Sequence, residues 1–304
     1  MGKVAFLFPG QGSQYVGMAA DLFEKSVEAK EMIRTADEAL GVNLSHIMFL
    51  GPEEQLKQTE YTQPAIFLHS VVLASLIRTL RPEAAAGHSL GEYSALVAAG
   101  ALQFYDAVKL VRFRGQSMQQ AGLDNPGTMA AVVGMDQEPL EAVCAEASAE
   151  GVVQCANFNS PGQIVISGSV TGVRKAMELA KAKGAKLVKE LVVSGAFHSP
   201  LMAPAQDKLG VALETANVYQ GRFPVYANVT AKPVTEAADI KKLLFEQVMK
   251  PVRWDETIRN MTADGFDTFY EVGPGKVLQG LVKRIAPSAT VYGIDKYEDV
   301  EKYL

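Results

Sequence analysis

The segment Gly87-His88-Ser89-Leu90-Gly91 is the feature that most constrains how this chain can fold. It fits the pattern G-x-S-x-G, in which a serine lies on a sharp turn between a strand and a helix. The glycines are needed because the turn brings backbone and helix so close together that Cβ atoms would clash. The pattern alone is weak, since a tight turn with a serine cap also satisfies it, so its surroundings must decide.

The residues around this turn favour a chemical role. The alanine-rich run Ala84–Ala86 predicts a short strand, and the small residues after Gly91 predict a helix that ends at Gly100. The Ser89 hydroxyl would then be exposed at the tip of the turn. The Leu90 amide would point the same way at a helix start, where N–H groups are unpaired and the dipole favours negative charge. The segment thus offers a nucleophile and half of an oxyanion hole.

Composition narrows the class of protein. A chain of 304 residues with 48% hydrophobic and 21% charged residues is ordinary for a soluble enzyme with one large domain, or a main domain with an insert. A net charge of −5 argues against nucleic-acid binding, and no apolar run is long enough to span a bilayer. The two cysteines, Cys144 and Cys155, have no metal or redox spacing, which indicates a reducing cytoplasm. With four histidines and no H-E-x-x-H, no metal site is expected.

The first third of the chain predicts a buried strand followed by helices. Residues Lys3–Phe8 are almost continuously apolar, which is typical of a parallel strand buried on both faces. The loop Pro9–Gln14 is either a structural turn or a loop whose backbone amides bind a ligand at the end of the strand. Helices are expected up to about Leu40, over Gln63–Leu80 and over Phe104–Ala121. Arg112 and Arg114 flank the apolar stripe of the last helix, so periodicity does not determine which faces the core.

The middle of the chain predicts an inserted subdomain. Strands are expected at Thr128–Met135, Val152–Ala156, Gln163–Ser167 and Lys186–Val193, with helices at Glu138–Glu150 and Val170–Lys183. This β-α-β-β-α-β order is the ferredoxin-like arrangement. It interrupts a longer α/β pattern that resumes with strands at Val225–Val229, Phe266–Val272 and Val291–Ile294 and a helix at Ala238–Val248. A ligand cleft is expected between the two bodies.

His198 is the candidate general base. It lies on a short loop between a strand end and a helix start, where Ser199 and Pro200 form an N-cap and first helical residue. A single loop histidine is more often a surface residue, so this position alone leaves the role open. His88 is a poor candidate, because adjacent side chains on extended backbone diverge and it would point away from Ser89.

Taken together, these motifs resemble a known family. The segments that carry the resemblance are Phe8-Pro9-Gly10-Gln11-Gly12-Ser13-Gln14, Gly87-His88-Ser89-Leu90-Gly91-Glu92, Arg114-Gly115, Phe197-His198-Ser199 and Glu271-Val272-Gly273-Pro274-Gly275. They resemble, in order and over essentially the whole chain, the malonyl-CoA:acyl-carrier-protein transacylases of bacterial fatty-acid synthesis. The resemblance implies an α/β fold with an α/β-hydrolase-like large subdomain, residues 1–126 and 195–304, and a ferredoxin-like subdomain at 127–194.

The resemblance also implies roles for particular residues. Ser89 would be the nucleophile and His198 its base, with the Gln11 and Leu90 amides forming the oxyanion hole. Arg114 would hold the malonyl carboxylate. The remaining implied positions are supporting ones: Gln247, on the stretch whose backbone carbonyl orients the histidine, Phe197, which would narrow the space beside the substrate α-carbon, and His88.

The implied reaction transfers malonyl from coenzyme A to the phosphopantetheine thiol of acyl carrier protein, with no bound cofactor. No nucleic acid or membrane partner is expected, and the chain is expected to be a cytoplasmic monomer. Three alternatives remain open from the sequence: a discrete loading acyltransferase of a polyketide synthase, a serine thioesterase or esterase, and a non-catalytic module that binds carrier proteins. The thioesterase is disfavoured because its usual acid is missing and Arg114 would have no purpose.

Overall fold

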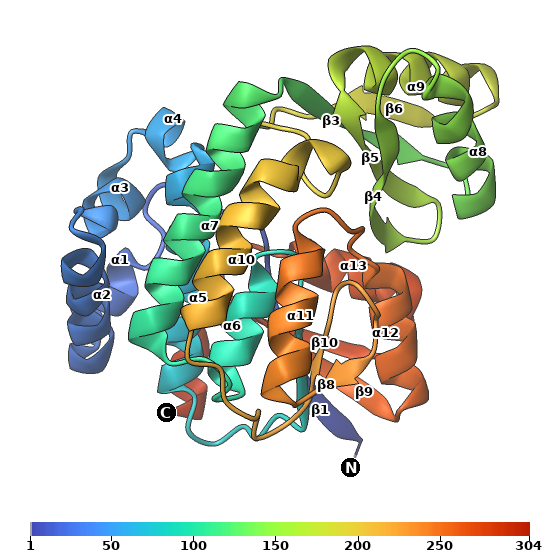
Figure 1. Ribbon diagram of the computed structural model, residues 1–304. Coiled ribbons are helices and arrows are strands. Elements are labelled where there is room, and N and C mark those ends of the chain that lie inside the picture. The colour runs from blue at the N-terminus through green and yellow to red at the C-terminus, as the bar shows by residue number, and fades with distance from the viewer. Residues whose placement is uncertain (1) are drawn as a thin grey trace.

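A six-stranded sheet forms the centre of the larger part of the molecule in the computed structural model, which describes residues 2–304 (Figure 1). Its strands are β1 (Lys3–Phe8), β2 (Ala84–Gly87), β7 (Val225–Tyr226), β8 (Pro233–Val234), β9 (Phe266–Val272) and β10 (Thr290–Ile294). The strand order is β10-β9-β1-β2-β7-β8, in which β8 pairs antiparallel with β7 and the other pairs are parallel.

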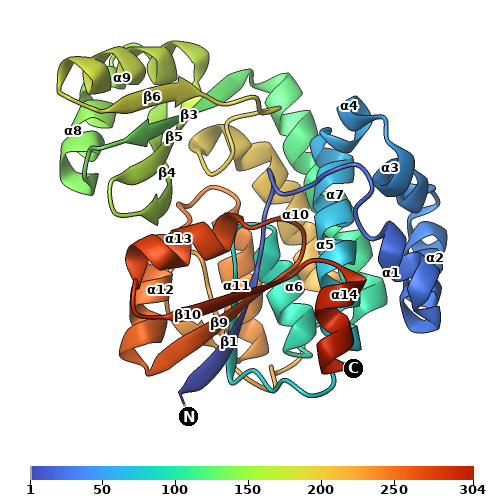
Figure 2. The ribbon, with the colours of Figure 1, turned by 180° about the vertical axis from the view of Figure 1, so that it is seen from behind.

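Helices cover both faces of this sheet, as Figures 1 and 2 show from opposite sides. They are α1 (Ala20–Lys25), α2 (Val27–Leu40), α3 (Leu44–Leu50), α4 (Glu53–Leu56), α5 (Thr59–Leu76), α6 (Gly91–Ala98), α7 (Phe104–Asp124), α10 (Ala203–Thr215), α11 (Ala237–Gln247), α12 (Trp254–Ala263), α13 (Val277–Ile285) and α14 (Tyr297–Val300), with 3₁₀ turns η1 (Pro200–Met202) and η2 (Glu301–Tyr303). None of the helices within residues 2–304 combines the length and the apolar composition that a bilayer crossing requires.

The side chains of β1 divide the core in two because successive residues of a strand point to opposite faces. Phe6 and Phe8 pack with α5, α6 and α7 in one cluster, whereas Ala5 and Leu7 pack with α12 and α13 in another. The last four residues of β1 are therefore all buried, which confirms the strand predicted at Lys3–Phe8. Burial on both faces explains why this strand is continuously apolar.

The smaller body is a four-stranded antiparallel sheet with two helices and a core of its own. It comprises β3 (Gly127–Val133), α8 (Gln137–Ala147), β4 (Val153–Ser160), β5 (Gln163–Ser169), α9 (Val170–Ala182) and β6 (Leu187–Glu190). The strand order β4-β5-β3-β6 with this β-α-β-β-α-β succession is the ferredoxin-like arrangement. The predicted fold class is confirmed, and we propose residues 127–194 as the limits of the insert.

Several element boundaries differ from the sequence-based ones. The helix expected from Gln63 begins at Thr59, and Pro64 lies inside it, because burial of nearly the whole of α5 outweighs one missing backbone hydrogen bond. That helix ends at Leu76, not Leu80, and the helix expected before Leu40 is interrupted at Ser26. Strand β7 stops at Tyr226.

In the insert, two strands end at other residues than predicted, and both differences involve residues that line a pocket. β4 extends to Ser160, so that Asn157 and Asn159 line a pocket between the two bodies. β6 ends at Glu190, where its pairing with β3 stops, and Leu191 and Val193 leave the sheet to line the same pocket. The cleft expected between the bodies is therefore present.

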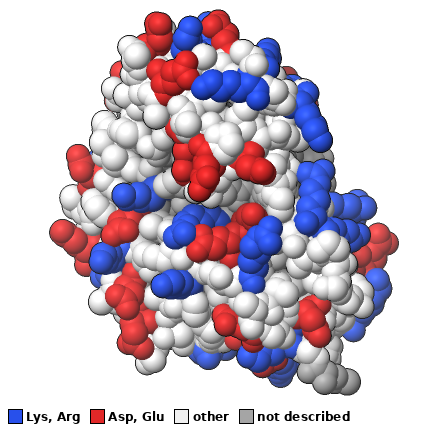
Figure 3. Space-filling view, turned by 90° about the vertical axis from the view of Figure 1, so that its right-hand side faces the viewer, with Lys and Arg blue, Asp and Glu red and all other residues white. Residues whose placement is uncertain are grey.

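The surface beside this cleft carries both signs of charge. Figure 3 shows the side of the molecule that bears α8 and α12, on which acidic and basic side chains alternate. On α12 and just before it, Arg259 pairs with Asp255 at 2.8 Å and Arg253 pairs with Glu256. Exposed ion pairs of this kind contribute only about 0–1 kcal/mol to the free energy of unfolding.

Candidate active site

Ser89 lies on a strained turn at the carboxyl end of β2. Its φ of 49° is in the left-handed region, which non-glycine residues seldom adopt. A Cβ added at Gly87 would lie 1.9 Å from the Gly91 carbonyl carbon, and one at Gly91 would lie 2.1 Å from the Phe8 oxygen. Both glycines are therefore required for the close approach of β1, β2 and α6, which lifts the serine hydroxyl clear of the backbone.

The structure brings His198 to this hydroxyl from more than a hundred residues away. Ser89 Oγ lies 2.8 Å from His198 Nε2. His198 Nδ1 lies 2.8 Å from the carbonyl oxygen of Gln247 and 3.1 Å from that of Lys250. Because carbonyl oxygens only accept, Nδ1 carries the proton and Nε2 is free to accept from the serine. Two backbone carbonyls thus orient the ring, in the place that a carboxylate has in many serine hydrolases.

Arg114, not Arg112, faces the site. Its guanidinium is buried, and Nη2 donates to Ser89 Oγ at 3.1 Å and to the Gln247 side-chain oxygen at 2.9 Å. Nη1 donates to Gln63 Oε1 at 2.7 Å. Within residues 2–304, no carboxylate lies within 4.0 Å of this guanidinium, so a buried cation is held by neutral acceptors. Such a group is ready to bind an anion.

A buried hydrogen-bond network behind the site was not predicted from the sequence. Gln247 Nε2 donates to Glu92 Oε2 at 2.7 Å and to the Ser89 carbonyl at 3.1 Å. The side-chain oxygen of Asn228 accepts a hydrogen bond from the Ser89 backbone amide at 2.7 Å, and the Asn228 backbone N–H donates to Glu92 Oε2 at 3.0 Å. The sequence contains one signal that could have pointed to Glu92, which is a carboxylate in a helix of small apolar residues directly after the glycine turn. Asn228 had none.

Replacing Glu92 with Gln is expected to remove a pH dependence of stability. Burial raises the pKa of Glu92 from its ordinary value of 4.5 to about 7, so folding favours the protonated carboxyl. This contribution is full below about pH 4.5 and is lost as the pH rises through about 7. From about pH 4.5 to pH 8, the wild type should lose on the order of 3 kcal/mol more of its free energy of unfolding than the variant. Urea unfolding measures this, and a pH-independent difference between the two proteins would contradict it.

The remaining predicted residues surround a pocket of about 240 Å³ that Ser89, His198 and Arg114 line together. Gln11 and Leu90 also line it, and neither backbone amide donates a hydrogen bond to another group within residues 2–304. Free amides at this position can receive a developing oxyanion. Phe197 is buried at the wall of the pocket.

His88 belongs to the boundary between the two bodies. Its Nε2 lies 2.9 Å from Asn159 Oδ1 on β4, and its ring lies 5.6 Å from that of Trp254. Burial lowers the pKa of His88, so the ring is neutral. Its hydrogen bond joins the turn that carries Ser89 to strand β4 of the insert, whereas the Ser89 hydroxyl has His198 and Arg114 as its partners.

The electrostatics of His198 suit a base that becomes active on binding an anion. Burial, and then the charge of Arg114, lower the pKa of His198 to about 3, so the ring is neutral at physiological pH. A carboxylate bound to Arg114 would offset that charge and raise the pKa of His198. This is the direction in which the imidazole becomes a better proton acceptor for the serine.

Fold and site together are those expected of an acyl-transferring α/β enzyme: a serine–histidine pair, a buried arginine beside the serine, and two amides without a hydrogen-bond acceptor among residues 2–304. The sequence matches the model of the acyl transferase domain family over residues 5–300. It is 48% identical to the malonyl CoA-acyl carrier protein transacylase of Bacillus subtilis, over 99% of this chain and 96% of that protein. It is 44% identical to the protein of the same name from Haemophilus influenzae, over the whole of both chains.

Solved structures agree with these sequence relatives. The malonyl CoA-acyl carrier protein transacylase of Coxiella burnetii superposes with a TM-score of 0.96 at 40% identity, covering 99% of this chain and 96% of the other. A malonyl-transacylase solved in complex with a type II PKS acyl-carrier protein gives the same TM-score and identity, with 99% of each chain covered. The chain belongs to the malonyl-CoA:acyl-carrier-protein transacylase family of acyltransferases.

Proposed function

We propose that the protein transfers a malonyl group from malonyl-CoA to the phosphopantetheine thiol of acyl carrier protein, through a malonyl ester of Ser89, and supplies type II fatty-acid synthesis. One observation carries the proposal. The Ser89 hydroxyl lies within hydrogen-bond distance of both a neutral imidazole and a buried guanidinium, at 2.8 Å and 3.1 Å. The imidazole fits a general base, and the guanidinium fits the free carboxylate that distinguishes malonyl from acetyl groups.

In the first half-reaction, His198 accepts the Ser89 proton as Oγ bonds to the thioester carbon. The oxyanion accepts hydrogen bonds from the Gln11 and Leu90 amides, and removal of one such donor typically raises the barrier by about 3 kcal/mol. The carbon–sulfur bond then breaks, and the imidazolium gives its proton to the departing sulfur, so that coenzyme A leaves as a thiol. The malonyl group remains on the serine as an ester.

In the second half-reaction, the carrier thiol gives its proton to His198 and attacks the ester through the same oxyanion. The serine oxygen leaves and takes the proton back, which restores the free enzyme. Both halves use the same groups in opposite order, so the expected kinetics are ping-pong.

Arg114 supports selectivity in this scheme. Gln63 and Gln247 hold its guanidinium beside the hydroxyl, at 2.7 Å and 2.9 Å. A malonyl carboxylate can pair with it, whereas an acetyl group would leave a buried cation without a counter-ion, which costs several kcal/mol, roughly 3–5. Phe197, at the wall of the pocket, would limit space beside the α-carbon and disfavour methylmalonyl groups.

We also propose that the chain works as a cytoplasmic monomer. The serine, histidine and arginine of the pocket all come from one chain, so catalysis needs no second copy. The two cysteines, Cys144 and Cys155, are free and buried, which suits a reducing compartment.

The test is the release of coenzyme A from malonyl-CoA with and without holo carrier protein, together with the intact mass of the enzyme. A transferase should form a malonyl adduct, release one equivalent of coenzyme A per enzyme without an acceptor, and turn over continuously when holo carrier protein is added. Continuous turnover in water alone would identify a thioesterase. Absence of any adduct would leave a binding module and overturn the proposal.

A further inference from the structure

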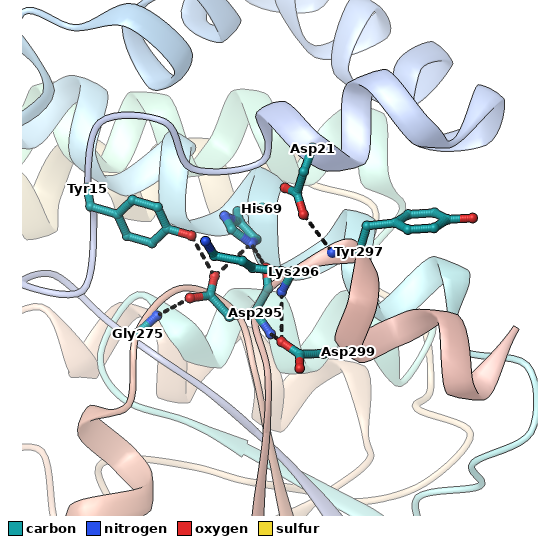
Figure 4. Close-up of polar contacts among 8 residues, drawn as sticks. All are labelled: Tyr15, Asp21, His69, Gly275, Asp295, Lys296, Tyr297 and Asp299. Atoms are coloured by element: carbon teal, nitrogen blue, oxygen red, sulfur yellow. Dashed lines mark hydrogen bonds and ion pairs between the residues drawn. The ribbon is translucent and has the colours of Figure 1, made fainter.

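A second polar cluster lies at the end of β10, around Asp295 (Figure 4). The Asp295 carboxylate accepts from the Tyr15 hydroxyl at 2.9 Å and from the Gly275 amide at 3.3 Å. His69 Nε2 lies 2.7 Å from the Asp295 carbonyl oxygen and 3.3 Å from its Oδ1. The Asp295 amide in turn donates to Asp299 Oδ2 at 3.1 Å, which fixes the backbone that presents the carboxylate.

Tyr15 belongs to the loop that carries Gln11, four residues earlier. Inside this loop, the Ser13 hydroxyl donates to the Gly10 carbonyl at 2.7 Å, so the segment is compact. A Cβ at Gly10 would lie 2.5 Å from the His88 carbonyl oxygen, so the base of the loop contacts the serine turn directly. The Tyr15 hydroxyl and the Gln11 amide therefore belong to one compact loop that rests on the serine turn.

Gly275 belongs to the turn after β9, which packs against the same loop. A Cβ at Gly273 would lie 2.7 Å from the Pro9 ring, and one at Gly275 would lie 3.4 Å from the Ser13 Cβ. The turn leads into α13, whose first residues Val277 and Leu278 line the substrate pocket. One carboxylate thus contacts the two segments that form this side of the pocket.

The donors in the cluster are settled by burial. His69 is fully buried on α5, and burial lowers its pKa, so a neutral ring donates from Nε2 to the Asp295 carbonyl. Burial, and then the charge of Asp295, raise the pKa of Tyr15 above its usual range, so the phenol remains a donor. Each hydrogen bond in the cluster therefore keeps the same donor and the same acceptor over the pH range in which the enzyme would work.

We propose that Asp295 and Tyr15 are positioning residues for the oxyanion hole, which hold the Gln11 loop at the distance that the transition state requires. This inference rests on the proposed transferase reaction. An oxyanion donor acts only when it lies about 2.7–3.1 Å from the oxyanion, so a shift of a few tenths of an ångström reduces its effect. The oxyanion forms only as Ser89 attacks the thioester, so this distance acts on the rate of acylation more than on the binding of malonyl-CoA.

Tyr15→Phe tests the inference because it removes one hydroxyl and keeps the ring. The expected result is at least an approximately tenfold fall in kcat and in the single-turnover rate of Ser89 malonylation, with KM for malonyl-CoA within about twofold of wild type. The same two rates should fall similarly in Asp295→Asn. The double variant should be no slower than the slower single variant, since both substitutions act through the one Tyr15–Asp295 contact. A melting temperature is measured for each, and the rates are taken well below it.

Tyr297→Phe is the matched control. Tyr297 lies two residues from Asp295, and its ring points away from the cluster (Figure 4). Only its backbone amide takes part in the hydrogen bonds drawn there, and it donates to Asp21 Oδ2 at 2.7 Å. Its loss of a hydroxyl should leave all rates unchanged. Wild-type malonylation rates for Tyr15→Phe, or a rise in KM that accounts for the whole loss, would overturn the inference. Failure of the wild type itself to form an adduct would instead overturn the proposed function.

Discussion

Ser89→Ala is expected to abolish the malonyl-enzyme and to lower malonyl transfer on the order of 10⁶-fold, as loss of the nucleophile does in a serine enzyme. The reason is that, among the described residues that line the pocket, only Ser89 carries a hydroxyl or thiol, and its oxygen lies 2.8 Å from the base. Intact mass after exposure to malonyl-CoA measures the adduct, and a coupled assay measures transfer.

Ser94→Ala is a suitable control for that variant. Ser94 lies on the same helix, α6, and its hydroxyl is buried without a hydrogen-bond partner among the described residues 2–304. Its removal should leave both adduct and transfer at wild-type levels. A full malonyl adduct on Ser89→Ala would show that the acyl group is carried elsewhere and would refute the assignment.

Arg114→Ala is expected to exchange one specificity for another. Malonyl transfer should be lost while acetyl transfer is retained or raised, so that the ratio of the two kcat/KM values falls by about 10³-fold. The physical reason is that removing the guanidinium takes away the partner of the malonyl carboxylate and also relieves the buried charge that an acetyl group leaves unpaired. Both kcat/KM values are measured with the two coenzyme A thioesters.

Arg112→Ala provides the matched control on the same helix. Its guanidinium lies 3.7 Å from Glu60 and 5.2 Å from the centre of the Tyr61 ring, outside the pocket. Its ratio of malonyl to acetyl transfer should match wild type. An equal fall in both transfers for Arg114→Ala would show that Arg114 supports the structure and does not select the substrate.

The elements that could be predicted are those whose signal is local. The glycine turn around Ser89, the buried strand Lys3–Phe8 and the β-α-β-β-α-β order of the insert each depend on backbone sterics or on periodicity over a few residues. Boundaries were less certain, because packing decided them: α5 continues through Pro64 since its burial outweighs one lost hydrogen bond.

The candidate site was predicted in outline, through the family resemblance, but its internal contacts were not. The resemblance indicated Ser89, His198 and Arg114, and the structure brings these three together. The roles of Glu92 and Asn228 in the network behind them had little or no sequence signal. A buried amide or carboxylate acquires its partner only when distant elements pack together.

By itself, the sequence determined the sharp turn that exposes a serine, the two-body α/β plan and the family, because each follows from residues close together in the chain or from motifs in a fixed order. Periodicity left open which of Arg112 and Arg114 faces the core, and the resemblance pointed to Arg114 and to a backbone carbonyl near Gln247. The tertiary structure places the Arg114 guanidinium at the serine hydroxyl, and it alone shows that the Lys250 carbonyl also contacts His198 and that Asp295 contacts the loop that carries Gln11. Those choices depend on how each helix is rotated against the sheet and on which strand ends meet at its carboxyl edge. Long-range packing sets both, and no local pattern of residues encodes them.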